Sequence, residues 1–173
     1  MAETPVTYRG AVYPWQCDHI GHMNVMWYVG KFDEATWNLF SELGLTPAYL
    51  REGRGGMAAV QQNITYKREL MPGDTVVVRT RLLEVREKVL RYVHEMSQAE
   101  GGEPVALCEL TVVHMDRAAH KSSPLPPAVA ERARAWLAGY LPWRRSFPRT
   151  RISRRACATA SIAKGRWCIS ARG

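Results

Sequence analysis

Residues 15–24 read Trp-Gln-Cys-Asp-His-Ile-Gly-His-Met-Asn and lead directly into a segment with helical periodicity. From Asn24 onward, apolar side chains recur at three- and four-residue steps as far as Leu43. Asn24 is a good N-cap, and Gly44 is a good residue to end a helix in the left-handed conformation. We therefore predict one long helix over residues 25–43.

Strand patterns lie on both sides of this helix, separated by turns rich in proline and glycine. The turn at 71–74 carries Pro and Gly in type II order, and residues 99–103 resemble a hairpin turn. We expect strands at 7–14, 57–69, 75–85, 89–99 and 104–115, and a short amphipathic helix at 127–138. This order predicts an α+β fold in which one long helix is wrapped by a five-stranded, mainly antiparallel sheet. The sheet edges remain open, so we expect a homodimer or a homotetramer.

Composition indicates a globular chain of 173 residues, of which 46% are hydrophobic. No apolar run approaches the ~18 residues of a membrane span, and the N-terminus does not resemble a secretory signal. We therefore expect a cytoplasmic protein without a membrane span. The four cysteines show no metal-ligand spacing, and Cys108 lies in a strand pattern as a small buried hydrophobe.

Positive charge gathers at the C-terminal end. Residues 141–173 hold nine Lys or Arg and no acid, which leaves 15 basic residues against 16 acidic ones in the rest of the chain. We predict a folded domain at 1–140 and a basic, disordered tail at 141–173. The charge alone would permit contact with nucleic acid or an anionic membrane, but we predict neither as a partner and assign the tail no function.

The segment before the long helix carries the chemistry. Asp18 lies in a loop a few residues upstream of a helix N-terminus, where the first N–H groups have no internal partner and the helix dipole favours negative charge. Such N–H groups can stabilise the oxyanion of a thioester, and a nearby carboxylate can act as base or nucleophile. Gly21 allows the loop to turn tightly.

The run Asp-His-Ile-Gly-His-Met-Asn at 18–24, followed by Tyr28 and by Phe-Asp-Glu-Ala at 32–35, resembles the signature of the 4-hydroxybenzoyl-CoA thioesterase family of hotdog proteins. The resemblance extends through Pro-Gly-Asp at 72–74 and Arg-Glu-Lys at 86–88, and it covers about residues 6–126. It implies a hotdog fold and an acyl-CoA thioesterase without a cofactor. Gln16 stands where the signature has a first Asp, which weakens any mechanism that needs two acids.

The resemblance also implies roles for individual residues, with the active site at a subunit interface. Asp18 is the catalytic carboxylate, and the Val25 amide polarises the thioester carbonyl. The remaining assignments are Asn24 as the helix cap, Tyr28 in the acyl pocket, and Arg86 and Lys88 on the CoA phosphates across a subunit boundary.

Each assignment has an alternative. Asp18 could be an ordinary loop residue that binds the backbone, and His22 could either support the loop or orient substrate or water. His19, His22 and Asp18 lie too close in one loop for good zinc geometry, so we predict no metal site. Cys17 is expected to face away from Asp18, which argues against a catalytic thiol.

The main alternative function is a hotdog protein that binds acyl-CoA or an acyl carrier without turning it over. Such a binding module needs no carboxylate at position 18, so Asp18 favours the thioesterase. The sequence leaves open whether the acyl group is aromatic, short or long, and whether Asp18 acts as base or nucleophile.

Overall fold

The structure is a computed structural model that describes residues 4–53 and 55–139. The predicted tail at 141–173 lies outside these residues, so the division into domain and tail stays a prediction. The elements in chain order are β1 (Val6–Ala11), the 3-10 helix η1 (Pro14–Gln16), α1 (Val25–Leu43), α2 (Pro47–Glu52), β2 (Gly55–Tyr66), β3 (Thr75–Val85), β4 (Val89–Gln98), β5 (Pro104–Asp116), β6 (Lys121–Ser122) and α3 (Pro127–Gly139).

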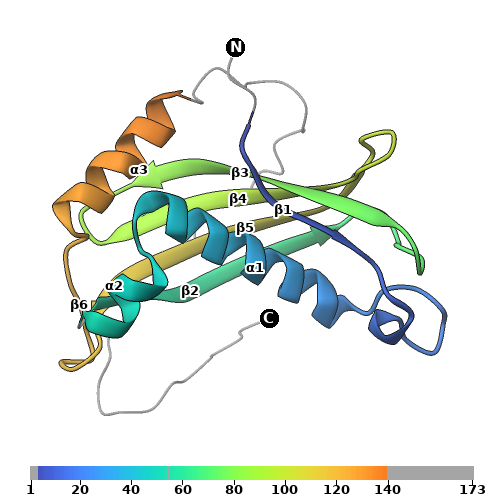
Figure 1. Cartoon of the computed structure of the whole chain (residues 1–173), viewed down its shortest axis with the longest axis horizontal. Helices are drawn as coiled ribbons and strands as arrows, with labels where there is room; N and C mark the ends of the chain where they lie inside the picture. The colour runs from blue at the N-terminus through green and yellow to red at the C-terminus, as the bar shows by residue number, and fades with distance from the viewer. Residues whose placement is uncertain (1–3, 54, 140–173) are drawn as a thin grey trace, which may run out of the picture. The chain divides into compact units, whose positions relative to one another are not determined.

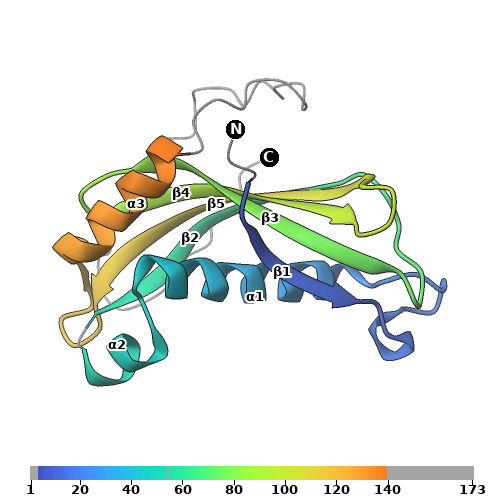
Figure 2. The same cartoon turned by 45° about the horizontal axis from the view of Figure 1, so that its top comes forward.

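The strands form one antiparallel sheet in the order β1-β3-β4-β5-β2, with the two-residue β6 paired to β5. The sheet curls around α1, which lies along one of its faces (Figure 1, Figure 2). α3 packs against β3 and also contacts α1. The predicted α+β hotdog fold is confirmed, with β6 added to the five expected strands.

The buried side of α1 makes the centre of the core. Phe32, Ala35, Leu39 and Leu43 are each at most 1% exposed and join the apolar side chains of the sheet. Met26, which we expected in this stripe, is instead 62% exposed. The stripe therefore starts one turn into the helix, and the first turn projects an apolar side chain away from the sheet.

A chain of hydrogen bonds crosses the core beneath α1. The Thr7 hydroxyl donates to the Val78 carbonyl and lies 2.6 Å from the Thr80 hydroxyl, which in turn lies 2.6 Å from His94 Nδ1. His94 Nε2 lies 2.9 Å from the Thr36 hydroxyl of α1, and the Tyr92 hydroxyl lies 3.2 Å from the same Thr36 hydroxyl. Because the Val78 carbonyl can only accept, the chain is satisfied when His94 Nδ1 carries the proton. The long helix is thus tied to the sheet by polar contacts as well as apolar packing.

Several predicted boundaries were wrong. We expected the first strand to reach residue 14, but β1 ends at Ala11 and Pro14 begins η1. The second strand runs from Gly55 to Tyr66 instead of 57–69, so it begins two residues and ends three residues earlier than predicted. The short elements α2 and β6 were not predicted. Cys108 is fully buried as expected.

Within the described residues, the helices are all too short or too polar to cross a membrane.

Candidate active site

The loop before α1 is held closed by the backbone. The Gln16 side chain accepts the Tyr13 N–H at 3.1 Å, and its carbonyl accepts the Asn24 N–H at 2.9 Å. Cys17 and Met23 form an isolated antiparallel bridge across the loop. Gly21 adopts φ 94° at the tip, as its predicted role in a tight turn requires. Gln16, which replaces an acid of the family signature, therefore stabilises the loop through hydrogen bonds of its side chain and its backbone carbonyl.

Asp18 lies inside this loop and is partly buried. Its Oδ1 atom accepts the Ile20 N–H at 3.0 Å, and its backbone N–H donates to the His22 carbonyl at 3.0 Å. The first contact is the Asx turn that a structural role would require. It engages one carboxylate oxygen and fixes the orientation of the group. Asp18 thus has a defined place in the loop, in addition to any chemical role.

The N-terminus of α1 follows directly. The Asn24 side chain accepts the Met26 N–H at 3.0 Å, and the Asn24 carbonyl accepts the Trp27 N–H, so Asn24 is the N-cap as predicted. Neither contact uses the Val25 N–H, which precedes both donors at the start of the helix. The Val25 residue is 58% exposed. A ligand can therefore approach the first turn of α1 at Val25.

Tyr28 lies one turn into α1 and is 4% exposed. Its hydroxyl donates to the Arg68 carbonyl at 3.1 Å, and burial raises its pKa to about 12, so the phenol stays protonated. The ring of Tyr66 meets the ring of Tyr28 edge-on at 5.2 Å and is partly open to solvent. The Met23 N–H donates to the Leu70 carbonyl at 2.8 Å. Residues 68–70 are therefore attached on one side to the loop and on the other to α1.

This attachment brings a second carboxylate to the site. Glu69 lies between the two anchored residues, and its Oε1 is 3.7 Å from His22 Nε2. The Glu69 side chain is 74% exposed and that of His22 is 24% exposed. Sequence reasoning missed Glu69, because no motif links position 69 to the loop. The order of elements could have suggested that residues leaving β2 lie near the helix start.

Arg86 and Lys88 are far from these residues within one chain. They lie in the turn between β3 and β4, whereas the Asp18 loop lies at the opposite end of β3, where the Val12 N–H donates to the Asp74 carbonyl. The 11 residues of β3 span roughly 35 Å at about 3.3 Å per residue. Arg86 Nε binds Glu84 at 2.7 Å, and this hydrogen bond lowers the pKa of the Glu84 carboxyl. One chain alone does not bring the two halves of the predicted site together.

Two further features considered from the sequence are the Cys17 thiol and a metal site. The Cys17 thiol points to the Tyr13 carbonyl at 3.8 Å, on the η1 side of the loop. No group of three or more His, Cys, Asp or Glu side chains suited to a metal ion gathers within the described part of the chain.

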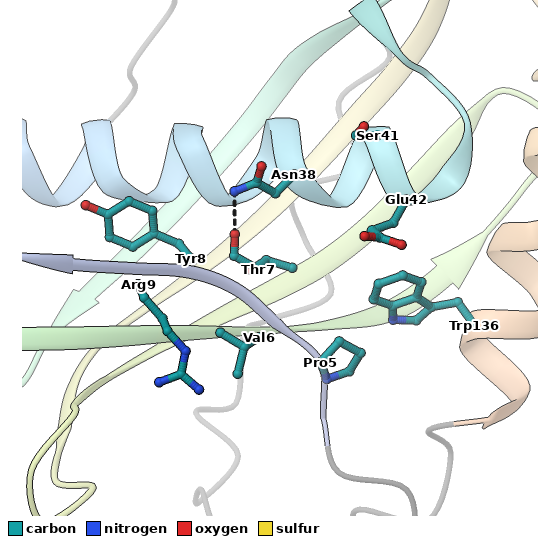
Figure 3. Close-up of a pocket in the computed structure, with 9 residues that line it drawn as sticks. All are labelled: Pro5, Val6, Thr7, Tyr8, Arg9, Asn38, Ser41, Glu42 and Trp136. Carbon is teal, nitrogen blue, oxygen red and sulfur yellow. Dashed lines mark hydrogen bonds between the residues drawn. The ribbon is translucent and has the colours of Figure 1, made fainter.

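A groove of about 670 Å³ runs between β1 and the second half of α1, where the Asn38 amide donates to the Thr7 carbonyl (Figure 3). None of the predicted site residues lines this groove.

A curled antiparallel sheet around one long helix is the arrangement of a hotdog protein. A model of the thioesterase-like superfamily matches residues 12–133, and the chain belongs to this superfamily.

Curated relatives carry thioesterase names. The betainyl-CoA thioesterase of Pseudomonas aeruginosa is 27% identical over 135 residues, which cover 78% of this chain and 85% of that protein. The L-carnitine dehydrogenase/betainyl-CoA thioesterase of Agrobacterium fabrum is 33% identical over 112 residues, which cover 65% of this chain. The chain spans 23% of the length of that second relative.

Solved structures agree with the fold. A thioesterase from Thermus thermophilus, complexed with coenzyme A and Zn, is 26% identical with a TM-score of 0.65, covering 76% of this chain and 99% of that one. A hypothetical protein from Staphylococcus aureus in complex with CoA has a TM-score of 0.75 at 16% identity, covering 86% of this chain and 99% of that one. The second likeness concerns the fold alone.

Proposed function

We propose that this protein hydrolyses an acyl-CoA thioester to the free acid and CoA, with Asp18 as the reacting carboxylate. The observation that carries the proposal is the position of a fixed carboxylate in the loop that ends at the open Val25 N–H. The finer resemblance, to 4-hydroxybenzoyl-CoA thioesterases in particular, remains part of this proposal. The names of the curated relatives make betainyl-CoA the first substrate to assay.

In this mechanism the thioester carbonyl oxygen accepts the Val25 N–H, where the positive end of the α1 dipole stabilises the developing oxyanion. Oδ1 of Asp18 is engaged by Ile20, so Oδ2 is the oxygen that acts. Acting as a base, it takes a proton from water while the water oxygen bonds to the carbonyl carbon and the C–S bond breaks. Acting as a nucleophile, it forms an anhydride and expels the CoA thiolate, and water then cleaves the anhydride. His22 orients substrate or water beside it.

Arg86 and Lys88, the basic groups expected to bind the CoA phosphates, lie far from Asp18 within one chain. We propose that two copies pair through β2, which is an edge strand with a run of exposed residues from Ala59 to Asn63. Antiparallel pairing about a twofold axis brings the Gly55 end of one strand to the Tyr66 end of the other. The turn at 86–88 lies at the Gly55 end of the sheet. Arg86 and Lys88 of the second copy would thus reach the CoA held at the Asp18 loop of the first.

The test is thiol release from short, long and aromatic acyl-CoAs, betainyl-CoA among them, by wild type and Asp18→Asn. Asparagine retains Oδ1 and can still accept the Ile20 N–H, so the loop keeps its hydrogen bond. We expect hydrolysis by wild type and a loss of about 10²- to 10⁴-fold in kcat for the variant. Full activity of Asp18→Asn removes this carboxylate from the mechanism. If wild type binds these thioesters without hydrolysing any of them, the protein is the acyl-CoA binding module instead.

A further inference from the structure

Glu69 gives the site a second carboxylate, on a segment that is attached to the start of α1. Its neighbours in the chain are held by the Tyr28 hydroxyl on Arg68 and by the Met23 N–H on Leu70. The backbone of Glu69 is therefore fixed between two anchors, and its carboxylate lies beside His22.

The guanidinium of Arg68, which precedes Glu69 in the chain, binds other partners than the Glu69 carboxylate. The Arg68 guanidinium turns to the neighbouring hairpin, where it pairs with Glu103 and donates to Gln98 Oε1 at 3.1 Å. The Glu69 side chain is 74% exposed, so its carboxylate is open to a ligand. The partly open ring of Tyr66 lies near the same helix turn, packed edge-on against Tyr28. An aromatic ring and a carboxylate together suit an organic cation, since aromatic faces attract quaternary ammonium groups.

From this arrangement we propose that Glu69 is a specificity-determining residue that selects acyl groups with a positive charge close to the thioester, with Tyr66 as its aromatic partner. The inference rests on the proposed function, because it places the thioester carbonyl at the Val25 N–H. A charge two bonds from the carbonyl carbon lies about 2.5 Å from it, by ordinary N–C–C geometry. The group that selects such a charge must lie at the helix start, where Glu69 lies and where Arg86 and Lys88 do not.

A matched pair of substrates isolates the charge. Betainyl-CoA, which is trimethylammonioacetyl-CoA, has the same shape as 3,3-dimethylbutanoyl-CoA. The two differ only in that a cationic nitrogen of the first is a neutral carbon in the second. We expect wild type to favour the cationic substrate in kcat/KM by roughly 10- to 100-fold beyond the ratio of the two uncatalysed hydrolysis rates. This factor lies between the values expected for one ion pair about 4 Å apart in water and near a protein surface. Glu69→Gln should lower this ratio to that of the two uncatalysed hydrolysis rates, because the cationic nitrogen also withdraws electrons from the carbonyl carbon. Glu69→Lys should lower the ratio further.

Glu131→Gln is the matched control, because Glu131 is an exposed glutamate on α3. It should keep the wild-type ratio. A wild-type ratio retained by Glu69→Gln overturns the inference. Hydrolysis of other acyl-CoAs with equal kcat/KM for the two matched substrates overturns the inference alone. Hydrolysis of no thioester at all overturns the proposed function as well.

Discussion

Tyr28 joins the first turn of α1 to the segment that carries Glu69 through one hydrogen bond between its buried hydroxyl and the Arg68 carbonyl. Replacement by Phe keeps the ring but leaves the carbonyl without this donor. We expect Tyr28→Phe to lower the free energy of unfolding by about 1 kcal/mol, measured by urea denaturation. Tyr66→Phe is the control, because Tyr66 is 46% exposed and should change stability by less than about 0.5 kcal/mol. Equal losses in both variants would contradict the role given to this bond.

The site was predictable from sequence where its residues are contiguous. Asp18, His22, Asn24 and Val25 fall within eight positions, so a local pattern placed them at one helix start, and the Asn24 cap is confirmed. The chemical roles of the others stay predictions. Glu69 could not be found this way, because it comes to the loop through hydrogen bonds made by its neighbours in the chain. Such contacts depend on the fold and produce no recognisable pattern of residue spacing in the sequence.

At the scale of elements, His94 links α1 to the sheet and gives the fold a pH dependence. Burial lowers the pKa of His94 from 6.5 to about 3. Between these values the unfolded chain binds a proton that the folded chain does not, so stability is full above about pH 6.5 and falls as the pH decreases toward 3. The loss due to this group approaches about 1.4 kcal/mol per pH unit.

Urea denaturation at pH 7 and pH 5 checks this. We expect wild type to lose more stability between the two values than His94→Gln does, because glutamine can still bind Thr36 and Thr80 but does not titrate. His19→Gln is the matched control, since His19 is exposed, and it should behave as wild type. The same loss in His94→Gln and wild type would show that another group is responsible.

The elements predicted best are those whose ends are set by local chemistry. Both ends of α1 were right, because Asn24 caps the start and Gly44 adopts φ 95° at the end. The end of β1 was wrong because of a contact distant in sequence. The Val12 N–H donates to the Asp74 carbonyl, and the Gly73 N–H donates to the Val12 carbonyl, so the chain binds the 71–74 turn two residues before Pro14. Alternation of residue types does not reveal such a contact.

For the whole molecule, the proposal requires a second copy along β2. Val60 is 55% exposed and sits at the irregularity of register between Ala59 and Gln61. We expect Val60→Asp to lower the mass of the assembly in analytical ultracentrifugation, since a charge on the edge strand opposes pairing. Val6→Asp is the control on the opposite edge strand, β1, and should leave the mass unchanged. A wild-type protein that is monomeric at assay concentrations would contradict the pairing.

The central claim is that the first N–H of α1 holds the thioester oxygen while Asp18 acts on the carbonyl carbon. Proline is tolerated at the first position of a helix, and Asn24 already has φ −66° and ψ 146°, which suits a residue before proline. Val25→Pro therefore removes the proposed donor with little strain. The decisive measurement is kcat of Val25→Pro against Val25→Ala with the best acyl-CoA substrate. The account predicts a loss of about 10²- to 10³-fold in the proline variant alone, and equal turnover by the two variants would contradict it.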